Sequence, residues 1–228
     1  MKKTLLFLIS IAFTLSGNSQ DYIPFLSGNS VWKSYGIDNS QPSTEVNVDV
    51  EYRLSEDTVI SGMNYRILQI DQSSPSSSYP FIEEAYLREN VDEKKVFIRF
   101  REEDQVLFEN NEEVLLYDFS LSEGESFELY DEFDGNEVNV INDTTYTIDG
   151  VERRAWLTDF PAIIADVPHS LYVEGIGFLS DPLMPIFPNE FVFYRAYTYC
   201  YRNAEDEVTQ EFDYPWVPEE FNCNATVS

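Results

Sequence analysis

Hydrophobic and polar residues alternate strictly from Glu45 to Leu54, in the stretch EVNVDVEYRL. One face of this stretch is aliphatic and aromatic, and the other is polar and includes Asp49 and Glu51. A period of two is typical of an antiparallel strand with one buried face. We therefore expect a half-buried strand here, with Asp49 and Glu51 facing solvent. The stretch KKVFIRF, residues 94–100, repeats the pattern.

Two turn signals join alternating runs. Ser61-Gly62 separates DTVI from MNYRILQI, and Asp149-Gly150 separates TYTI from VERRAWL. A glycine-ending dipeptide between such runs is typical of a β-hairpin. Runs of this kind recur along the chain and predict roughly ten strands, with no convincing amphipathic helix. The predicted fold is all-β: an antiparallel meander that forms a barrel or a sandwich.

Three stretches read as loops: SSPSSSYP (residues 73–80), PAIIADVPHS (161–170) and DPLMPIFPNE (181–190). Loops of this kind often carry binding residues. Strand patterns continue on both sides of the first loop, so residues 20–228 are predicted to form a single all-β domain. In the late strand FVFYRAYTYCYR, aromatic residues occupy both faces, so at least one of them either faces outward or is covered by a loop.

The N-terminus has the layout of a secretory signal peptide. Lys2 and Lys3 precede the apolar run TLLFLISIAFTL, and the small residues Gly17 and Ser19 precede Gln20. The apolar run is shorter than the span of about 20 residues that a membrane helix needs. We expect residues 1–19 to be removed near Ser19. The mature protein is then secreted, periplasmic or at the cell surface, with no membrane span.

The formal net charge of the whole chain is −28 at pH 7. Nucleic-acid binding needs a lysine and arginine footprint on the phosphates, so this charge excludes that class. An anionic membrane surface would repel the chain as well. Aromatic residues make up 15% of the sequence, which excludes an unstructured chain.

The two cysteines, Cys200 and Cys223, are predicted to form a disulfide. An even cysteine count in a chain bound for an oxidising compartment is typical of such a bond. A shared metal is the less favoured alternative, since no histidine lies near either residue.

The stretch VLLYDFSLSEGESF places Asp118 between two aromatics and ahead of Gly124. Aspartate before a turn accepts hydrogen bonds from the following backbone N–H groups, and glycine supplies a positive φ. We therefore interpret Asp118 and Gly124 as structural turn residues, with backbone amides or an arginine such as Arg88 as partners of the carboxylate. The stretch VEGIG receives the same interpretation as a turn, with Glu174, Gly175 and Gly177.

No catalytic residue is assigned from the sequence. Asp118 and Glu174 are the candidates if the protein is a glycan-active hydrolase that uses paired carboxylates. The single histidine, His169, has no motif that marks a base beside a nucleophile. We expect no cofactor, with calcium as an alternative at the segment DEFDGNE. Its oxygen ligands would be Asp131, Asp134, Asn136 and Glu137, but a solvated acidic loop explains the segment better.

Several landmarks occur together: DTVISGMNY, AYLREN, LLYDFSLSEGESF, VEGIG and the late cysteine pair. In this order they resemble uncharacterised secreted proteins of the Bacteroidota with L-Y-D-F…G-D and E-G-I-G landmarks. Many of those proteins look like cargo of the type IX secretion system with a C-terminal sorting domain. Because the sequence ends at Ser228, we expect that domain to be absent here. The resemblance implies a fold and a location, and no chemistry.

The sequence thus favours a secreted, non-catalytic β-domain with a binding or structural role at or outside the cell surface. A glycan, a small apolar ligand and a surface protein remain open as partners. One alternative is a lipocalin-like barrel that binds a small apolar ligand, suggested by GNSVW at residues 28–32. The other is the extracellular hydrolase described above.

Overall fold

The computed structural model describes residues 21–38, 46–72, 82–101, 113–128, 137–148, 150–159, 171–183, 194–202 and 208–211, without the side chains of 36–38, 46–48, 194–197, 199 and 208–211. Several predicted features lie outside these residues: the signal peptide (1–19), the loop at 73–80, Asp131, Asp134, Asn136, Asp149, His169 and Cys223.

The described chain is all-β and antiparallel, as predicted, and contains no helix. One sheet has eight strands in the spatial order β13-β12-β1-β2-β3-β4-β5-β6. Its strands are β1 (Val31–Asp38), β2 (Val46–Ile60), β3 (Met63–Gln72), β4 (Glu84–Asn90), β5 (Lys95–Phe100), β6 (Val114–Asp118), β12 (Tyr194–Arg202) and β13 (Val208–Glu211).

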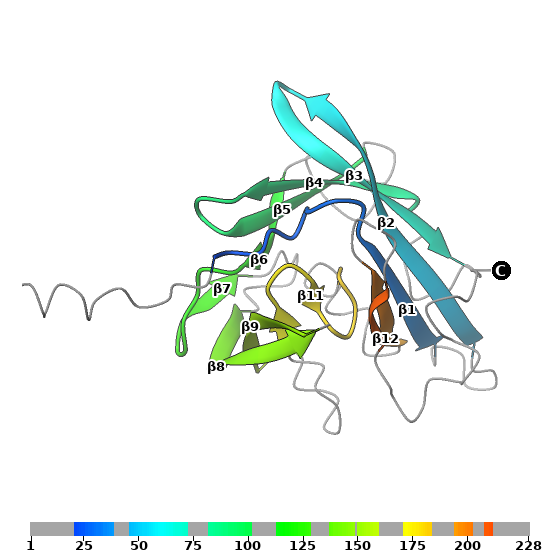
Figure 1. Ribbon diagram of the computed structural model, residues 1–228. Helices are drawn as coiled ribbons and strands as arrows, with labels where there is room; N and C mark the ends of the chain where they lie inside the picture. Colours follow the sequence, from blue (N-terminus) through cyan, green and yellow to red (C-terminus); the bar gives the residue numbers. More distant parts are fainter. Residues whose placement is uncertain are drawn as a thin grey trace, which may run out of the picture.

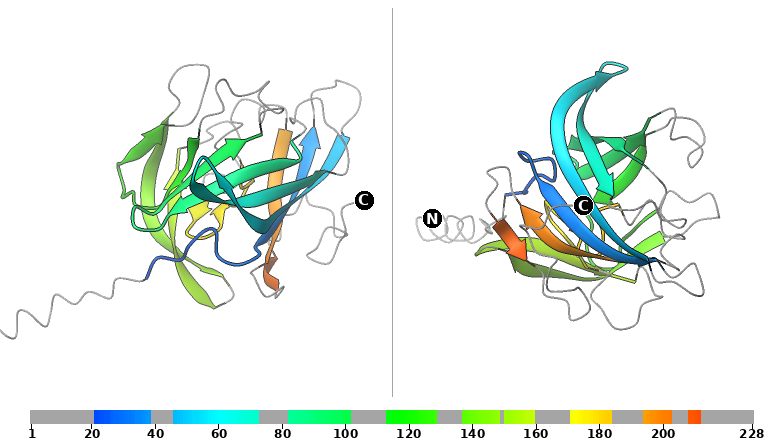
Figure 2. Two further views of the ribbon diagram at one scale, coloured as in Figure 1. Left: turned by 90° about the horizontal axis from the view of Figure 1, so that it is seen from above. Right: turned by 90° about the vertical axis from the view of Figure 1, so that its right-hand side faces the viewer.

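The second sheet has five strands in the order β11-β10-β9-β8-β7. Its strands are β7 (Ser126–Glu128), β8 (Glu137–Ile148), β9 (Val151–Thr158), β10 (Leu171–Val173) and β11 (Gly177–Phe178). Both sheets curl, and their concave faces enclose one core (Figures 1 and 2). The strand count exceeds the predicted ten because β7, β10, β11 and β13 are too short to show an alternating pattern. No described segment forms a helix long and apolar enough to cross a membrane.

Both predicted hairpins are present. β2 and β3 pair up to Ile60↔Met63, and the two residues between them, Ser61 and Gly62, have φ of 53° and 83°. Two successive positive φ values define the type I′ turn, whose twist matches that of the flanking strands. β8 and β9 pair up to Ile148↔Val151, and Gly150 has a φ of 74°.

The prediction for the polar face of β2 was wrong at two positions. Asp49 is 6% exposed and Glu51 is 7% exposed, so both faces of the strand are covered at this point. The Glu51 carboxylate lies 3.4 Å from the Nζ atom of buried Lys33 on β1, and it also pairs with Arg53. These ion pairs satisfy a charge that alternation alone would place in water.

The core between the sheets is aromatic. Trp156 and Tyr172 stack with their ring centroids 4.9 Å apart, and Phe25 stacks on Trp32 at 5.2 Å. The largest fully buried side chains are Trp32, Trp156, Tyr52, Tyr65, Tyr117, Tyr172, Tyr201, Phe25, Phe119 and Phe178. Aromatic pairs in such geometries contribute about 0.5–1.5 kcal/mol beyond the area they bury.

Residues 21–26, which we call the N-terminal strap, run across the molecule to reach β1 (Figure 1). The Glu89 carboxylate of β4 holds the strap by accepting hydrogen bonds from the Tyr22 hydroxyl (2.6 Å) and from the N–H groups of Phe25 (2.8 Å) and Leu26 (3.0 Å). Phe25 is 1% exposed and contacts the rings of Tyr117 and Phe119 as well as Trp32. The strap therefore completes the core.

Cys200 of β12 is fully buried and lies opposite Lys33 of β1. Its predicted partner, Cys223, lies outside the described residues. The disulfide stays a prediction.

Replacing Phe25 with alanine should lower the free energy of unfolding by about 3–5 kcal/mol, because a buried aromatic is removed from a closed core. Urea unfolding followed by tryptophan fluorescence measures this loss. Val91→Ala is the matched control, since Val91 is 51% exposed at the β4–β5 turn and should change stability by less than about 0.5 kcal/mol. Equal stability of the two variants would contradict the role given to the strap.

Candidate functional site

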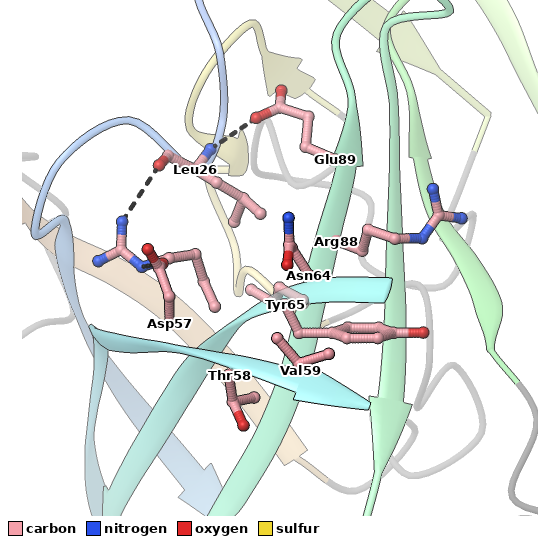
Figure 3. A pocket seen from close by; sticks show the side chains of 10 residues that line it. Leu26, Asp57, Thr58, Val59, Asn64, Tyr65, Arg88 and Glu89 are labelled. Atoms are coloured by element: carbon pink, nitrogen blue, oxygen red, sulfur yellow. Dashed lines mark hydrogen bonds and ion pairs between the residues drawn. The ribbon is translucent and has the colours of Figure 1, made fainter. Parts of the chain in front are cut away.

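The candidate site is a groove of about 400 Å³ at the end of the β2–β3 hairpin (Figure 3). The β3–β4 ladder ends at Arg66↔Leu87, although both strands continue beyond this pair. A space therefore opens between the hairpin and β4. The lining residues come from β2, β3, β4 and the N-terminal strap: Leu26, Asp57, Thr58, Val59, Asn64, Tyr65, Arg66, Leu87, Arg88 and Glu89.

The strap forms one wall of the groove, and two groove residues hold it there. Glu89 accepts the Leu26 N–H, and Arg66 Nη1 donates to the Leu26 carbonyl at 3.5 Å (Figure 3). Arg66 also donates to the Ser55 carbonyl and forms an ion pair with Asp57 at 3.1 Å. The charged groups at this wall are thus partnered within the protein, and they fix the shape of the groove.

Arg88 and Tyr65 join the groove to the neighbouring strands. The Arg88 guanidinium donates to both carboxylate oxygens of Glu113, at 2.7 and 2.5 Å, and lies 4.4 Å from the centre of the Phe97 ring. Burial, and then the nearby Glu113 carboxylate, raise the pKa of Tyr65 above its usual value, so this hydroxyl stays neutral at physiological pH.

Apolar side chains are exposed around the hairpin end. Val59 is 65% exposed and Met63 is 42% exposed, on either side of the Ser61-Gly62 turn. This end of the hairpin projects from the body of the molecule (Figure 1). Apolar groups on a projecting element, next to a groove with polar groups, are typical of a contact surface for a partner.

Asp118 lies at the end of β6 and makes turn contacts. Its Oδ1 atom accepts hydrogen bonds from the N–H (2.9 Å) and the hydroxyl (2.5 Å) of Ser120. Its Oδ2 atom lies 3.5 Å from Lys95 Nζ. Of the two kinds of partner expected for this carboxylate, the backbone amide is present, whereas Arg88 pairs with Glu113 instead. Both carboxylate oxygens of Asp118 are therefore engaged: one holds the turn and the other pairs with Lys95 of β5.

The predicted turn glycines all have positive φ. Gly124 has a φ of +85°, with open space at its α-carbon, whereas Gly177 has a φ of +90° and packs against Tyr117. A Cβ atom at Gly177 would lie 2.5 Å from the Tyr117 hydroxyl oxygen. At Gly175 (φ +75°), a Cβ atom would lie 2.8 Å from an Arg153 nitrogen.

Glu174, which precedes these glycines in VEGIG, is 3% exposed. Burial raises its pKa, while Lys94 and a hydrogen bond from the Ile23 backbone partly oppose that shift. The backbone contact with Ile23 makes Glu174 a second anchor of the N-terminal strap. Asp118 and Glu174 therefore both hold neighbouring chain segments in place.

Of the four calcium-ligand candidates, only Glu137 is described, and it begins β8 as an exposed residue that accepts a hydrogen bond from Ser126 Oγ at 3.3 Å. Within the described ranges, no three His, Cys, Asp or Glu side chains lie close enough together to hold a metal ion.

A buried carboxyl was missed by the sequence analysis. Asp181 begins one of the predicted loops and lies in no strand, yet it is 0% exposed. Its carboxyl accepts hydrogen bonds from the Tyr52 hydroxyl (2.7 Å) and the Leu183 N–H (2.8 Å). Burial raises its pKa to about 7, an effect that these two bonds and Ser34 partly oppose. The polar residue and the following proline suggested a loop, and nothing local in the sequence indicates that Tyr52 lies opposite.

Comparisons of this chain with models of known protein families, with curated proteins and with solved structures gave no match.

Gly177→Ala should destabilise the protein more than Gly124→Ala. Both substitutions place a Cβ at a positive φ, which costs about 1–2 kcal/mol. Gly177→Ala also forces the new methyl group against Tyr117, which adds about 1–3 kcal/mol. Chemical denaturation of both variants compares the two costs, and equal losses would rule out the close contact with Tyr117.

Asp181→Asn should change how stability depends on pH. The folded pKa of about 7 exceeds the ordinary value of 3.8, so the contribution of Asp181 is fully present below about pH 4 and is lost as the pH rises through 7. The loss is about 1.4 kcal/mol per pH unit across that window. The stability of the variant relative to the native protein should therefore rise from pH 4 to 7 and level off above it.

Urea unfolding at each pH unit from 4 to 8 measures this difference. Tyr52→Phe is the matched probe, since it removes a bond that favours the ionised carboxylate. It should extend the loss of stability to higher pH. A pH-independent difference between Asp181→Asn and the native protein would disprove the raised pKa.

Proposed function

We propose that this protein is a secreted, non-catalytic binding module whose contact surface is the end of the β2–β3 hairpin and its groove. The observation that carries the proposal is the exposure of Val59 and Met63 on a projecting hairpin beside a groove of about 400 Å³. The charged groups Arg66, Arg88 and Glu89 of the groove are held by internal partners, so they are pre-organised for contact.

The aromatic core argues against the alternative of a barrel that holds a small apolar ligand. Where the chain is described, the space between the sheets is filled by rings such as Trp156, Tyr172 and Phe119, with centroids 4.9–5.8 Å apart. A lipocalin-like site needs an open interior at this place. Ligand binding is therefore better supported at the outer groove.

The contacts of Asp118 and Glu174 argue against the hydrolase alternative. A glycosidase needs one carboxyl to protonate the leaving group and a second to act as base or nucleophile. Asp118 is engaged by Ser120 and Lys95, and Glu174 is buried against the strap. Neither carboxyl lines the groove.

The extracellular location remains part of the proposal. It rests on the signal-peptide pattern at residues 1–19, on the high negative charge and on the resemblance to secreted proteins of the Bacteroidota. A surface protein or a glycan is the partner class we favour for this location.

A double substitution, Val59→Asp with Met63→Asp, should weaken partner binding at least tenfold, or about 1.4 kcal/mol, because it removes the exposed apolar contacts. The assay measures binding of purified protein to arrays of glycans and extracellular proteins. Ile141→Asp is the control: it alters an aliphatic residue that is 52% exposed on β8 of the other sheet, and it should leave affinity unchanged.

Equal binding by all three proteins would remove the hairpin from the proposed function. The same panel also tests the hydrolase. Turnover of a glycan that Asp118→Ala or Glu174→Ala abolishes, without loss of folding, would replace the binding module with an enzyme.

A further inference from the structure

β2 is longer than β1 beside it, so its far end has no described strand on that side. β1 pairs with β2 only from Val46 to Arg53, and the next N–H, that of Leu54, donates to the Ser30 carbonyl at 2.9 Å. Upstream of β1 the chain turns at Gly28 (φ +63°) and runs into the strap. From residue 55 to residue 60, β2 has β3 on one side and no described strand on the other.

The turn geometry shows which backbone groups face the open side. In a two-residue type I′ hairpin, the residues that flank the turn, here Ile60 and Met63, exchange hydrogen bonds with each other. Because the pattern alternates along an antiparallel pair, Thr58 also bonds inward to β3. The N–H and C=O groups of Asp57 and Val59 therefore point away from β3, toward the side with no described strand.

The side chains along this edge select the kind of chain that fits. Glu56 and Asp57 are exposed, and they are followed by Val59 and Ile60. Open strand edges attract other strands, and proteins guard them with charges and bulges. β2 has a bulge between Leu54 and Asp57. Together with these two carboxylates, the bulge guards the edge against negatively charged chains.

A second copy of this protein is disfavoured as the occupant. Each copy carries a formal net charge of −28, and an added copy would bring its own Glu56 and Asp57 to an acidic edge. An extended segment with basic residues has the complementary charge, and its apolar residues match Val59. Charge complementarity of this kind speeds association and selects among partners.

We propose that the open edge of β2, from Asp57 to Ile60, binds an extended basic segment of a partner polypeptide as an added β-strand. This inference rests on the proposed function, in that it names the partner class for the same hairpin. Main-chain hydrogen bonds to Asp57 and Val59 supply the pairing. The exposed Glu56 carboxylate and the negative net charge of the protein supply the preference for lysine or arginine, whereas the Asp57 carboxylate already pairs with Arg66.

The test uses an octapeptide of alternating lysine and valine as the probe, and fluorescence anisotropy with the native protein as the measurement. Val59→Pro should weaken binding at least tenfold, because it removes an outward N–H that the hairpin itself does not use. Ile141→Ala, on β8 of the other sheet, is the control. It leaves the hairpin and the charge of the protein unchanged, so its affinity should stay within about threefold of the native value.

A second measurement holds even if Val59→Pro perturbs the hairpin. In the native protein, the peptide should slow hydrogen exchange at the amides of Asp57 and Val59 and leave that of Thr58 unchanged. Unchanged exchange at both outward amides would overturn the proposal. Binding of an alternating glutamate–valine peptide as tight as that of the lysine–valine peptide would also overturn it. Equal affinity of the lysine–valine peptide for Val59→Pro and for the native protein would overturn it too, because that result indicates charge attraction alone.

The two proposals fail in different ways. A partner from the arrays can lose affinity for the Val59→Asp, Met63→Asp variant while the lysine–valine peptide leaves the Asp57 and Val59 amides unprotected from exchange. The hairpin then binds by side-chain contact, and only the strand-addition proposal fails. If no partner depends on the hairpin, the binding module itself is wrong.

Discussion

Most tyrosine hydroxyls and indole N–H groups of the described core are held by hydrogen bonds, and much of the structure follows from this requirement. The buried Tyr65 hydroxyl, which has no hydrogen-bond partner among the described residues, is an exception. A buried polar group without a partner costs about 1–3 kcal/mol, so rings with polar atoms are stable inside only where an acceptor is available. The acceptors are mainly carbonyls of turns and loops. The Trp32 indole N–H donates a hydrogen bond to the Ile176 carbonyl, and the Trp156 indole N–H donates one to the Leu121 carbonyl. The Tyr117 hydroxyl donates one to the Pro182 carbonyl.

These bonds connect the sheets to the segments between strands. Tyr172 of β10 donates to the carbonyl of Asp118, whose side chain holds the following turn. The Tyr117 hydroxyl also accepts the N–H of Phe178, which brings the VEGIG turn against β6 and explains why only glycine fits at residue 177. The landmarks of the sequence, LLYDF and VEGIG, thus meet in one place, and their shared role is to close the core.

Alternation and glycine turns were sufficient to predict the fold class and both hairpins, because these signals are local. Val50, Tyr52 and Leu54 all face the core as their spacing predicts. The prediction that Glu51 faces solvent was wrong, because the burial of Glu51 depends on Lys33, a residue of another strand. The burial of Asp181 could not be predicted for the same reason, since its partner Tyr52 is 129 residues away.

The groove could be predicted only in part. The Ser61-Gly62 turn indicates where the hairpin ends, but the sequence does not show that β2 extends past β1 or that β3 separates from β4 after Arg66↔Leu87. The first of these features depends on where the chain turns at Gly28, upstream of β1. Glu89, which holds the strap and lines the groove, stood in the sequence as one acid among 42 acidic residues.

The strap also sets the order in which the molecule can close. The strap and β1 are synthesised before the groups that bind them: Glu89 is 64 residues from Phe25, and the carbonyl that binds Trp32 of β1 is 144 residues away. β1 moreover pairs with β12 near the other end of the chain. Contacts of such high sequence separation form late and slow folding, because the entropy of closing the long loops must be lost first. The N-terminal aromatics therefore stay exposed on the nascent chain until most of the domain has been made.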